Sequence, residues 1–148
     1  MVADAIECSR AGIWVFSDHA GGRRLRCLKL YDRVNGCIAR VPPDERDERV
    51  APYFDALQRD GHIVAADILT YHATQGYFLE DLKTTNVKSL MAAAFSVNGQ
   101  LYGAVTCTQV GEQMHWTLRQ LQTLKRMGAR ASLALHRARE ASRLDQGR

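Results

Sequence analysis

The sequence lacks any long hydrophobic run. None of its apolar segments approaches the roughly 18 residues that a membrane-spanning helix needs. The N-terminus carries Asp4 and Glu7 and has no apolar core typical of a secretion signal. The 46% hydrophobic share, without repeats or low-complexity tracts, excludes disordered and collagen-like classes. We therefore expect one cytoplasmic domain over residues 1–143, followed by a short tail at 144–148.

Metal and nucleophile motifs are also missing. The four cysteines form no C-x-x-C pair, and no Cys/His cluster has zinc-ligand spacing. No P-loop, nucleophile elbow or spaced carboxylate pair occurs, and Glu80 and Asp81 are adjacent, so on a helix they do not face each other. The sequence therefore predicts buried, hydrophobe-like cysteines, no catalytic residue, no metal site and no required cofactor.

A net positive charge is found only in the C-terminal segment. Residues 117–148 hold eight basic and two acidic side chains, whereas the first 116 residues have a net charge of −2. A nucleic-acid surface needs basic residues together with aromatic or base-reading groups, and no aromatic residue follows Trp116. We expect a solvated helix face, with neither a nucleic acid nor a membrane as partner.

Strand patterns dominate the chain. Asn98-Gly99 favours a type I′ turn between two strands, and Gly21-Gly22 marks another hairpin. Alternating or β-branched runs predict six strands, at 11–17, 24–31, 37–41, 62–66, 89–95 and 101–108.

Four helices complete the expected elements. A short one covers residues 3–10, a second starts with Pro52 in its first turn, and a third lies near 77–83 within an irregular 67–86 segment. The last begins at Thr117 with a capping box to Gln120 and runs to about Arg143. Its apolar and small residues follow an alternating three- and four-residue spacing typical of a dimer seam: Leu121, Leu124, Gly128, Ala131, Leu135 and Ala138. The order of elements predicts an α+β fold with an antiparallel sheet.

The ordered set of motifs resembles a GAF domain, the bacterial sensor family related to PAS domains, and most of all the GAF modules that precede histidine kinases and diguanylate cyclases. The matching stretches are Ala11–Ser17, Leu25–Asp32, Tyr53–Leu57, Val64–Asp67, Ser89–Phe95, Asn98–Gly103 and Trp116–Thr117.

The resemblance implies a central antiparallel sheet of five or six strands. Terminal helices would pack on one face, and a ligand pocket would lie on the other, under the 67–86 segment. Strand alternation puts Trp14 and Phe16 on one face, which the resemblance turns toward the pocket. The candidate pocket residues are Trp14, Phe16, Tyr71, His72, Tyr77, Phe78, Thr106 and Thr108.

Several active or photosensory GAF subtypes leave signatures that are absent here. Methionine sulfoxide reductases of this family need a cysteine in the covering segment, but none occurs between Cys37 and Cys107. Photosensory members attach their chromophore through a cysteine next to a histidine, whereas Tyr71 precedes His72. Residues 106 and 108 are threonines, whereas the reductases of this family need acidic residues in these last strands.

The sequence therefore predicts a non-enzymatic sensory module that regulates an output domain such as a histidine kinase or diguanylate cyclase, in the same protein or in trans. We expect a homodimer through the terminal helices, which responds to a small ligand or partner by population shift. Two alternatives stay open: a free methionine sulfoxide reductase, and a ligand-free dimerisation scaffold. The ligand is not specified by the residues.

Overall fold

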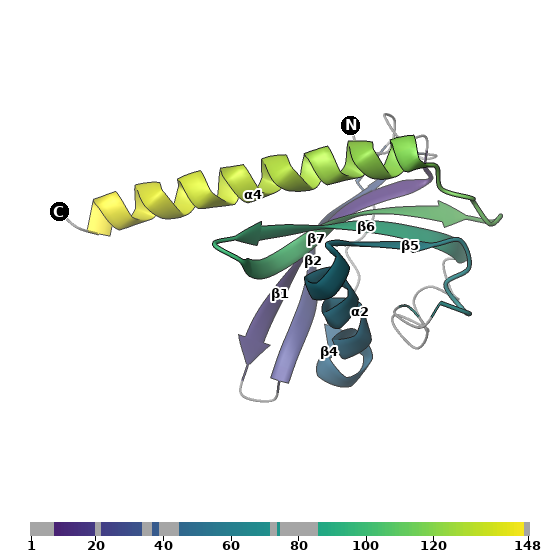
Figure 1. Ribbon diagram of the computed structural model, residues 1–148, viewed down its shortest axis with the longest axis horizontal. Coiled ribbons are helices and arrows are strands. Elements are labelled where there is room, and N and C mark those ends of the chain that lie inside the picture. The colour runs from purple at the N-terminus through teal and green to yellow at the C-terminus, as the bar shows by residue number, and fades with distance from the viewer. Residues whose placement is uncertain are drawn as a thin grey trace.

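The centre of the molecule is an antiparallel sheet. The computed structural model describes residues 8–19, 22–33, 37–38, 45–71, 74 and 86–146. In these parts the sheet has the order β3-β2-β1-β7-β6-β5, and β4 pairs with β2 (Figure 1). The elements are β1 Arg10–His19, β2 Gly22–Asp32, β3 Cys37–Ile38, β4 Glu45–Arg46, α2 Asp47–Asp60, β5 His62–Ala65, β6 Val87–Val97, β7 Gln100–Val110 and α4 Leu118–Gln146. The α+β class is confirmed, with five longer strands and two of two residues each.

Two hydrophobic layers cover the sheet, one on each face. The helix α2 packs on one face and α4 on the other (Figure 1). The α2 layer is centred on Tyr53, Leu57 and Trp14, and the α4 layer on Met91, Cys107 and Leu124. Neighbouring residues of β7 alternate between these layers, as expected for a strand buried on both sides.

The β6–β7 turn has the backbone that its sequence requires. Asn98 and Gly99 have φ of 53° and 78°, so both central residues take the left-handed conformation of a type I′ turn. Asparagine and glycine adopt this conformation more easily than other residues. The resulting hairpin, and the earlier β1–β2 hairpin, confirm the sequence prediction.

The capping box at the start of α4 is present. The Thr117 amide donates to Gln120 Oε1 at 2.8 Å, and the Gln120 amide donates to Thr117 Oγ1 at 3.1 Å. From there α4 runs for 29 residues, about 44 Å, and its far end projects beyond the sheet (Figure 1). None of the described helices is both long and apolar enough to cross a membrane.

The small-residue spacing of α4 serves the chain's own core. Leu124 is fully buried, while Leu121, Ala131 and Leu135 pack against the same layer and Ala138 is exposed. Helix packing on a sheet needs the same three- and four-residue periodicity as a dimer seam. This changes the interpretation of the predicted seam, because its N-terminal positions contact the sheet.

One boundary differs from the sequence predictions. The helix α2 begins at Asp47, five residues before Pro52, and it tolerates the proline with the loss of one backbone hydrogen bond. Of the strand predicted at 37–41, the structure describes Cys37–Ile38, which form β3, and residues 39–41 lie outside the described residues. The helices expected at 3–10 and 77–83 fall mostly or wholly outside the described residues.

Gly128 allows α4 to approach the sheet closely. A Cβ atom at this position would lie 2.8 Å from the Ala94 carbonyl oxygen, which cannot move without disturbing β6. We expect Gly128→Val to lower the free energy of unfolding by about 2 kcal/mol or more in chemical denaturation. The matched control, Ala129→Val on the exposed side of the same helix, should cost only about 0.5 kcal/mol. Equal losses for the two variants would contradict this packing.

Candidate ligand-binding face

The face of the sheet toward α2 carries the sequence-predicted pocket residues that the structure describes. Trp14 is buried in the α2 layer and Phe16 packs against it, whereas Val15 packs on the α4 side. Thr106 and Thr108 alternate with Cys107, which lies in the α4 layer. The predicted orientation of β1 is therefore confirmed, and strand alternation places the two threonines on the face of Trp14.

Trp14 and Thr106 are joined across the β1–β7 pair. The indole Nε1 donates to Thr106 Oγ1 at 3.2 Å, and that hydroxyl donates to the Gly12 carbonyl oxygen at 3.5 Å. Thr106 is only 4% exposed. Its hydroxyl group is thus already bonded inside the protein, to the Trp14 indole and to the Gly12 carbonyl group.

The segment that follows β5 begins with a compact turn against this face. The Tyr71 amide donates to the Asp67 carbonyl oxygen at 3.2 Å, and the buried Thr74 hydroxyl donates to the Ile68 carbonyl oxygen at 2.9 Å. The half-buried Tyr71 packs against the α2 layer. The other predicted pocket residues of this segment, His72, Tyr77 and Phe78, lie outside the described residues.

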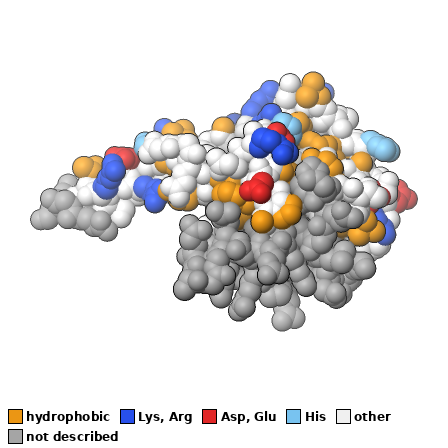
Figure 2. Space-filling view, turned by 60° about the horizontal axis from the view of Figure 1, so that its bottom comes forward, with side chains coloured by type: hydrophobic (Ala, Val, Ile, Leu, Met, Phe, Trp, Pro, Cys, Tyr) orange, Lys and Arg blue, Asp and Glu red, His pale blue; other side chains and the backbone are white. Residues whose placement is uncertain are grey.

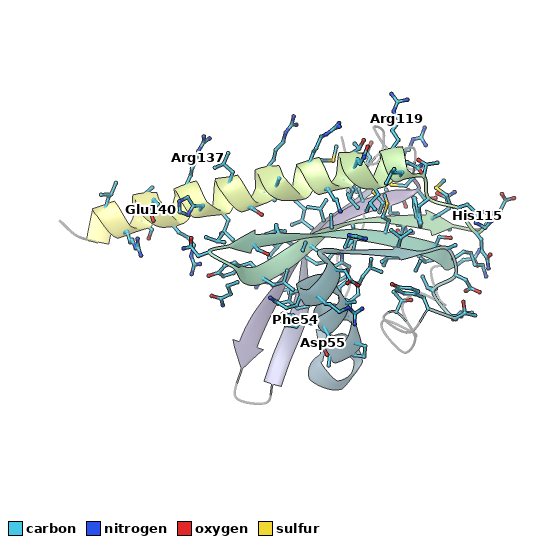
Figure 3. The ribbon with its side chains drawn as sticks, viewed as in Figure 1. Phe54, Asp55, His115, Arg119, Arg137 and Glu140 are labelled. Atoms are coloured by element: carbon cyan, nitrogen blue, oxygen red, sulfur yellow. The ribbon has the colours of Figure 1, made fainter. Side chains whose placement is uncertain are left out.

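A hollow of about 520 Å³ opens at the other end of this face, between β1, α2 and the β6–β7 hairpin. Phe16 meets Phe54 edge to face in its wall, with ring centroids 4.9 Å apart and planes at 87°. Figure 3 shows Phe54 and its neighbour Asp55 on α2, on the side of the sheet opposite α4. The described lining residues are Phe16, Phe54, Gln58, Gly99, Gln100, Leu101 and Tyr102.

The chemistry of the hollow is aromatic and uncharged among these residues. The polar lining residues are Gln58, Gln100 and Tyr102, whose amide and phenol groups are neutral, and the Tyr102 side chain packs against the α4 layer. The sequence identified only Phe16 of this set. The turn signal at Asn98-Gly99 located the hairpin, but nothing in the sequence showed that its tip lies near α2.

Tyr102 connects the hollow with α4. Its ring lies 4.5 Å from the guanidinium carbon of Arg139, a cation–π contact, and its hydroxyl accepts a hydrogen bond from Arg139. The same hydroxyl donates to Gln100 Oε1 at 3.4 Å. A path of contacts therefore runs from Gln100, a residue that lines the hollow, through Tyr102 to Arg139 of α4.

The described residues contain no group of three histidine, cysteine, aspartate or glutamate side chains arranged to hold a metal ion. The polar residues that line the hollow carry neutral side chains, which suit an organic ligand better than a cation.

The chain belongs to the GAF domain family, whose family profile matches residues 1–135. A search of curated protein sequences returned no match.

Solved structures of GAF photoreceptors share the fold. The cyanobacteriochrome receptor PixJ is 17% identical, with a TM-score of 0.75 over 93% of this chain and 89% of the other. The blue-light absorbing form of the Thermosynechococcus elongatus PixJ GAF domain is 16% identical, with a TM-score of 0.74 over 99% and 84%. The phycocyanobilin-bound GAF domain of a cyanobacterial phytochrome is 14% identical, with a TM-score of 0.71 over 90% and 78%. At these identities the likeness establishes the fold alone.

The Trp14–Thr106 bond can be measured by a double-mutant cycle. We expect Trp14→Phe and Thr106→Val each to lower the free energy of unfolding by about 1–2 kcal/mol, because each leaves one buried polar group or cavity behind. The double variant should recover about 1 kcal/mol relative to the sum of the single losses. Strict additivity in urea denaturation would show that the two side chains do not interact.

Proposed function

We propose that this chain is a sensory GAF module that binds a small organic ligand on the α2 face and passes the binding signal to α4. The observation that supports this most directly is the position of Tyr102, which lines the hollow and contacts Arg139 of the projecting helix. The photoreceptor GAF domains of the same fold make a sensory role plausible.

The proposed mechanism is a shift between two arrangements of α4. A ligand that bonds Gln100 or stacks on Phe16 competes with, or strengthens, the Gln100–Tyr102–Arg139 contacts. The helix then responds only to the extent that the ligand binds one arrangement better than the other. Couplings of this kind typically amount to 1–3 kcal/mol, a 5- to 150-fold effect.

The ligand we propose is a planar, largely uncharged heteroaromatic compound, because the described walls offer ring edges and neutral amides. A covalently attached bilin of the usual kind has no thiol to join, since no cysteine occurs between Cys37 and Cys107. Reversible binding of such a compound is what the residues support.

A reductase function has weaker support. Cys107 is fully buried, and its pKa is raised because it hydrogen-bonds to Cys8 and because burial disfavours the thiolate. A catalytic thiolate would need the opposite environment. The second alternative is a dimerisation scaffold without a ligand. The binding experiment below distinguishes it from a ligand-binding module.

The partners we propose are a second copy of the chain and an output domain such as a histidine kinase or diguanylate cyclase. With Leu121 and Leu124 packed on the sheet, a dimer contact needs other residues. Leu133 and Leu144, 48% and 69% exposed, lie eleven residues apart, so they share one face of α4. Figure 2 shows hydrophobic and charged side chains interspersed along this projecting end.

Ligand binding is tested by native mass spectrometry of the purified chain and a thermal-shift screen of neutral heteroaromatic compounds, with phycocyanobilin included as one probe. We expect compounds that raise the melting temperature by about 2 °C or more to lose this effect in Gln58→Leu, because the variant removes an amide from the hollow. The control Gln122→Leu, on exposed α4, should respond like the unchanged chain.

Two results would contradict the proposal. Equal responses of Gln58→Leu and Gln122→Leu would place binding elsewhere, and a screen without any shift would favour the scaffold. A phycocyanobilin adduct that survives denaturation would overturn the expectation of reversible binding.

The dimer contact is tested by Leu133→Glu in size-exclusion chromatography with light scattering. We expect this variant to become monomeric with an unchanged melting temperature, because Leu133 contacts solvent in the single chain. Leu118→Glu, 70% exposed at the start of the same helix, is the matched control and should stay dimeric. Leu135→Glu should instead lower the melting temperature, because Leu135 packs against the α4 layer. A mass unaffected by Leu133→Glu would reject this contact.

A further inference from the structure

Two free thiols lie together on the α4 side of the sheet, away from the proposed ligand site. Cys8, just before β1, and Cys107, on β7, are both fully buried in the same hydrophobic layer. The β1–β7 register sets Ala11 opposite Cys107, so Cys8 lies only three residues before the partner of Cys107. The prediction that the cysteines are buried is confirmed for these two. The sequence did not show that they lie in one layer, because they are 99 positions apart.

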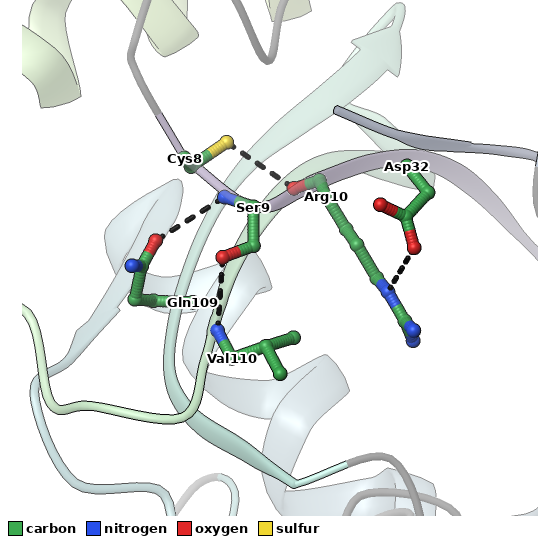
Figure 4. A network of polar contacts seen from close by, with 6 residues as sticks. All are labelled: Cys8, Ser9, Arg10, Asp32, Gln109 and Val110. Atoms are coloured by element: carbon green, nitrogen blue, oxygen red, sulfur yellow. Dashed lines mark hydrogen bonds and ion pairs between the residues drawn. The ribbon is translucent and has the colours of Figure 1, made fainter. Parts of the chain in front are cut away.

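A polar network holds Cys8 against β7 (Figure 4). The Ser9 amide donates to Gln109 Oε1 at 3.2 Å, and the Val110 amide donates to Ser9 Oγ at 3.1 Å. The Cys8 thiol is 3.2 Å from the Arg10 carbonyl oxygen. Since Ser9 is tied to β7 through both its backbone and its side chain, its neighbour Cys8 has little freedom to move away from β7.

The two thiols are not equivalent. The pKa of Cys8 is lowered, chiefly because the Cys107 thiol hydrogen-bonds to it, whereas the pKa of Cys107 is raised by the same bond and by burial. We therefore assign Cys8 as the attacking thiol of the pair.

We propose that Cys8 and Cys107 are a redox modification site that closes to an intramolecular disulfide when a hydroperoxide oxidises the protein. This site goes beyond the proposed ligand-sensing function and does not depend on it. It rests on two buried, free thiols within one layer, on the register that sets Ala11 opposite Cys107, and on the network that fixes the neighbour of Cys8 to β7.

The reaction balances with one hydroperoxide. The Cys8 sulfur attacks the terminal oxygen of ROOH, the O–O bond breaks, and ROH leaves with the thiol proton, which gives a sulfenic acid at Cys8. The Cys107 sulfur then attacks the Cys8 sulfur, the S–O bond breaks, and water leaves with the Cys107 proton. Two thiols lose two electrons, and the hydroperoxide gains them. Because both sulfur atoms are buried, the first step requires a local opening of the segment before β1.

The disulfide would join the entry of the chain into β1 with the strand that precedes α4. It closes a loop of about 100 residues, which is long enough for a large restriction of the unfolded chain. Oxidation would thus fix the two ends of the domain relative to each other on the face where α4 packs.

The experiment uses the full chain, reduced, desalted and exposed to hydrogen peroxide. After denaturation, alkylation of free thiols and peptide mapping, we expect a Cys8–Cys107 linked peptide and two fewer alkylated cysteines. The melting temperature should rise by roughly 5 °C or more and return to its starting value after dithiothreitol. The double variant Cys27→Ser/Cys37→Ser should behave identically, whereas Cys8→Ser should show neither the linkage nor the shift.

Other outcomes overturn the proposal. These are a linkage through Cys27 or Cys37, a sulfinic acid at Cys8 or Cys107 without any linkage, and four thiols that stay alkylatable after peroxide treatment. The peptide map of the unchanged chain decides between them even if Cys8→Ser does not fold.

Discussion

The pairing of β1 with β7 is the contact on which the other features depend. It joins Arg10 to Thr108 and Val15 to Gly103, so residues more than eighty positions apart become neighbours. The Trp14–Thr106 bond crosses this pair on one face of the sheet, and Cys8 and Cys107 lie in the layer on the other face. A shift of one residue in this register would turn the side chains of the shifted strand to the opposite face and so separate both pairs of residues.

The two faces of the sheet differ in their packing. The α2 face carries the hollow, whose described walls are aromatic rings and neutral amides. The α4 face is densely packed, with Gly128 against the Ala94 carbonyl group and Leu124 fully buried. The hairpin that ends in Asn98-Gly99 reaches both, because Tyr102 lines the hollow and also holds Arg139. In our proposal this hairpin tip transmits ligand binding on the α2 face to the helix on the α4 face.

Local signals in the sequence predicted most of the fold. The Asn98-Gly99 turn, the Thr117–Gln120 capping box and the alternation around Trp14 depend on neighbouring residues only, and all three are present. The site was predicted less well. Nothing near Gln58 or Gln100 shows that α2 and the hairpin tip enclose a space, because that depends on the packing of segments about forty residues apart.

The seam on α4 shows a different kind of limit. A helix that packs on a sheet and one that packs on a partner helix need the same spacing of small and apolar residues. Gly128 and Leu124 were therefore recognised as contact positions, but the surface that they contact was only decided by the three-dimensional fold.

The β1–β7 pairing also has a consequence for synthesis of the protein. The β1–β2 hairpin is complete once residue 32 has left the ribosome, but the strand that covers the open edge of β1 ends at residue 110. At a synthesis rate of 5–20 residues per second, that edge of β1 stays unpaired for roughly 4–16 seconds until β7 is complete. Unpaired strand edges recruit other strands, so this interval is the period in which the growing chain is most exposed to association with other copies.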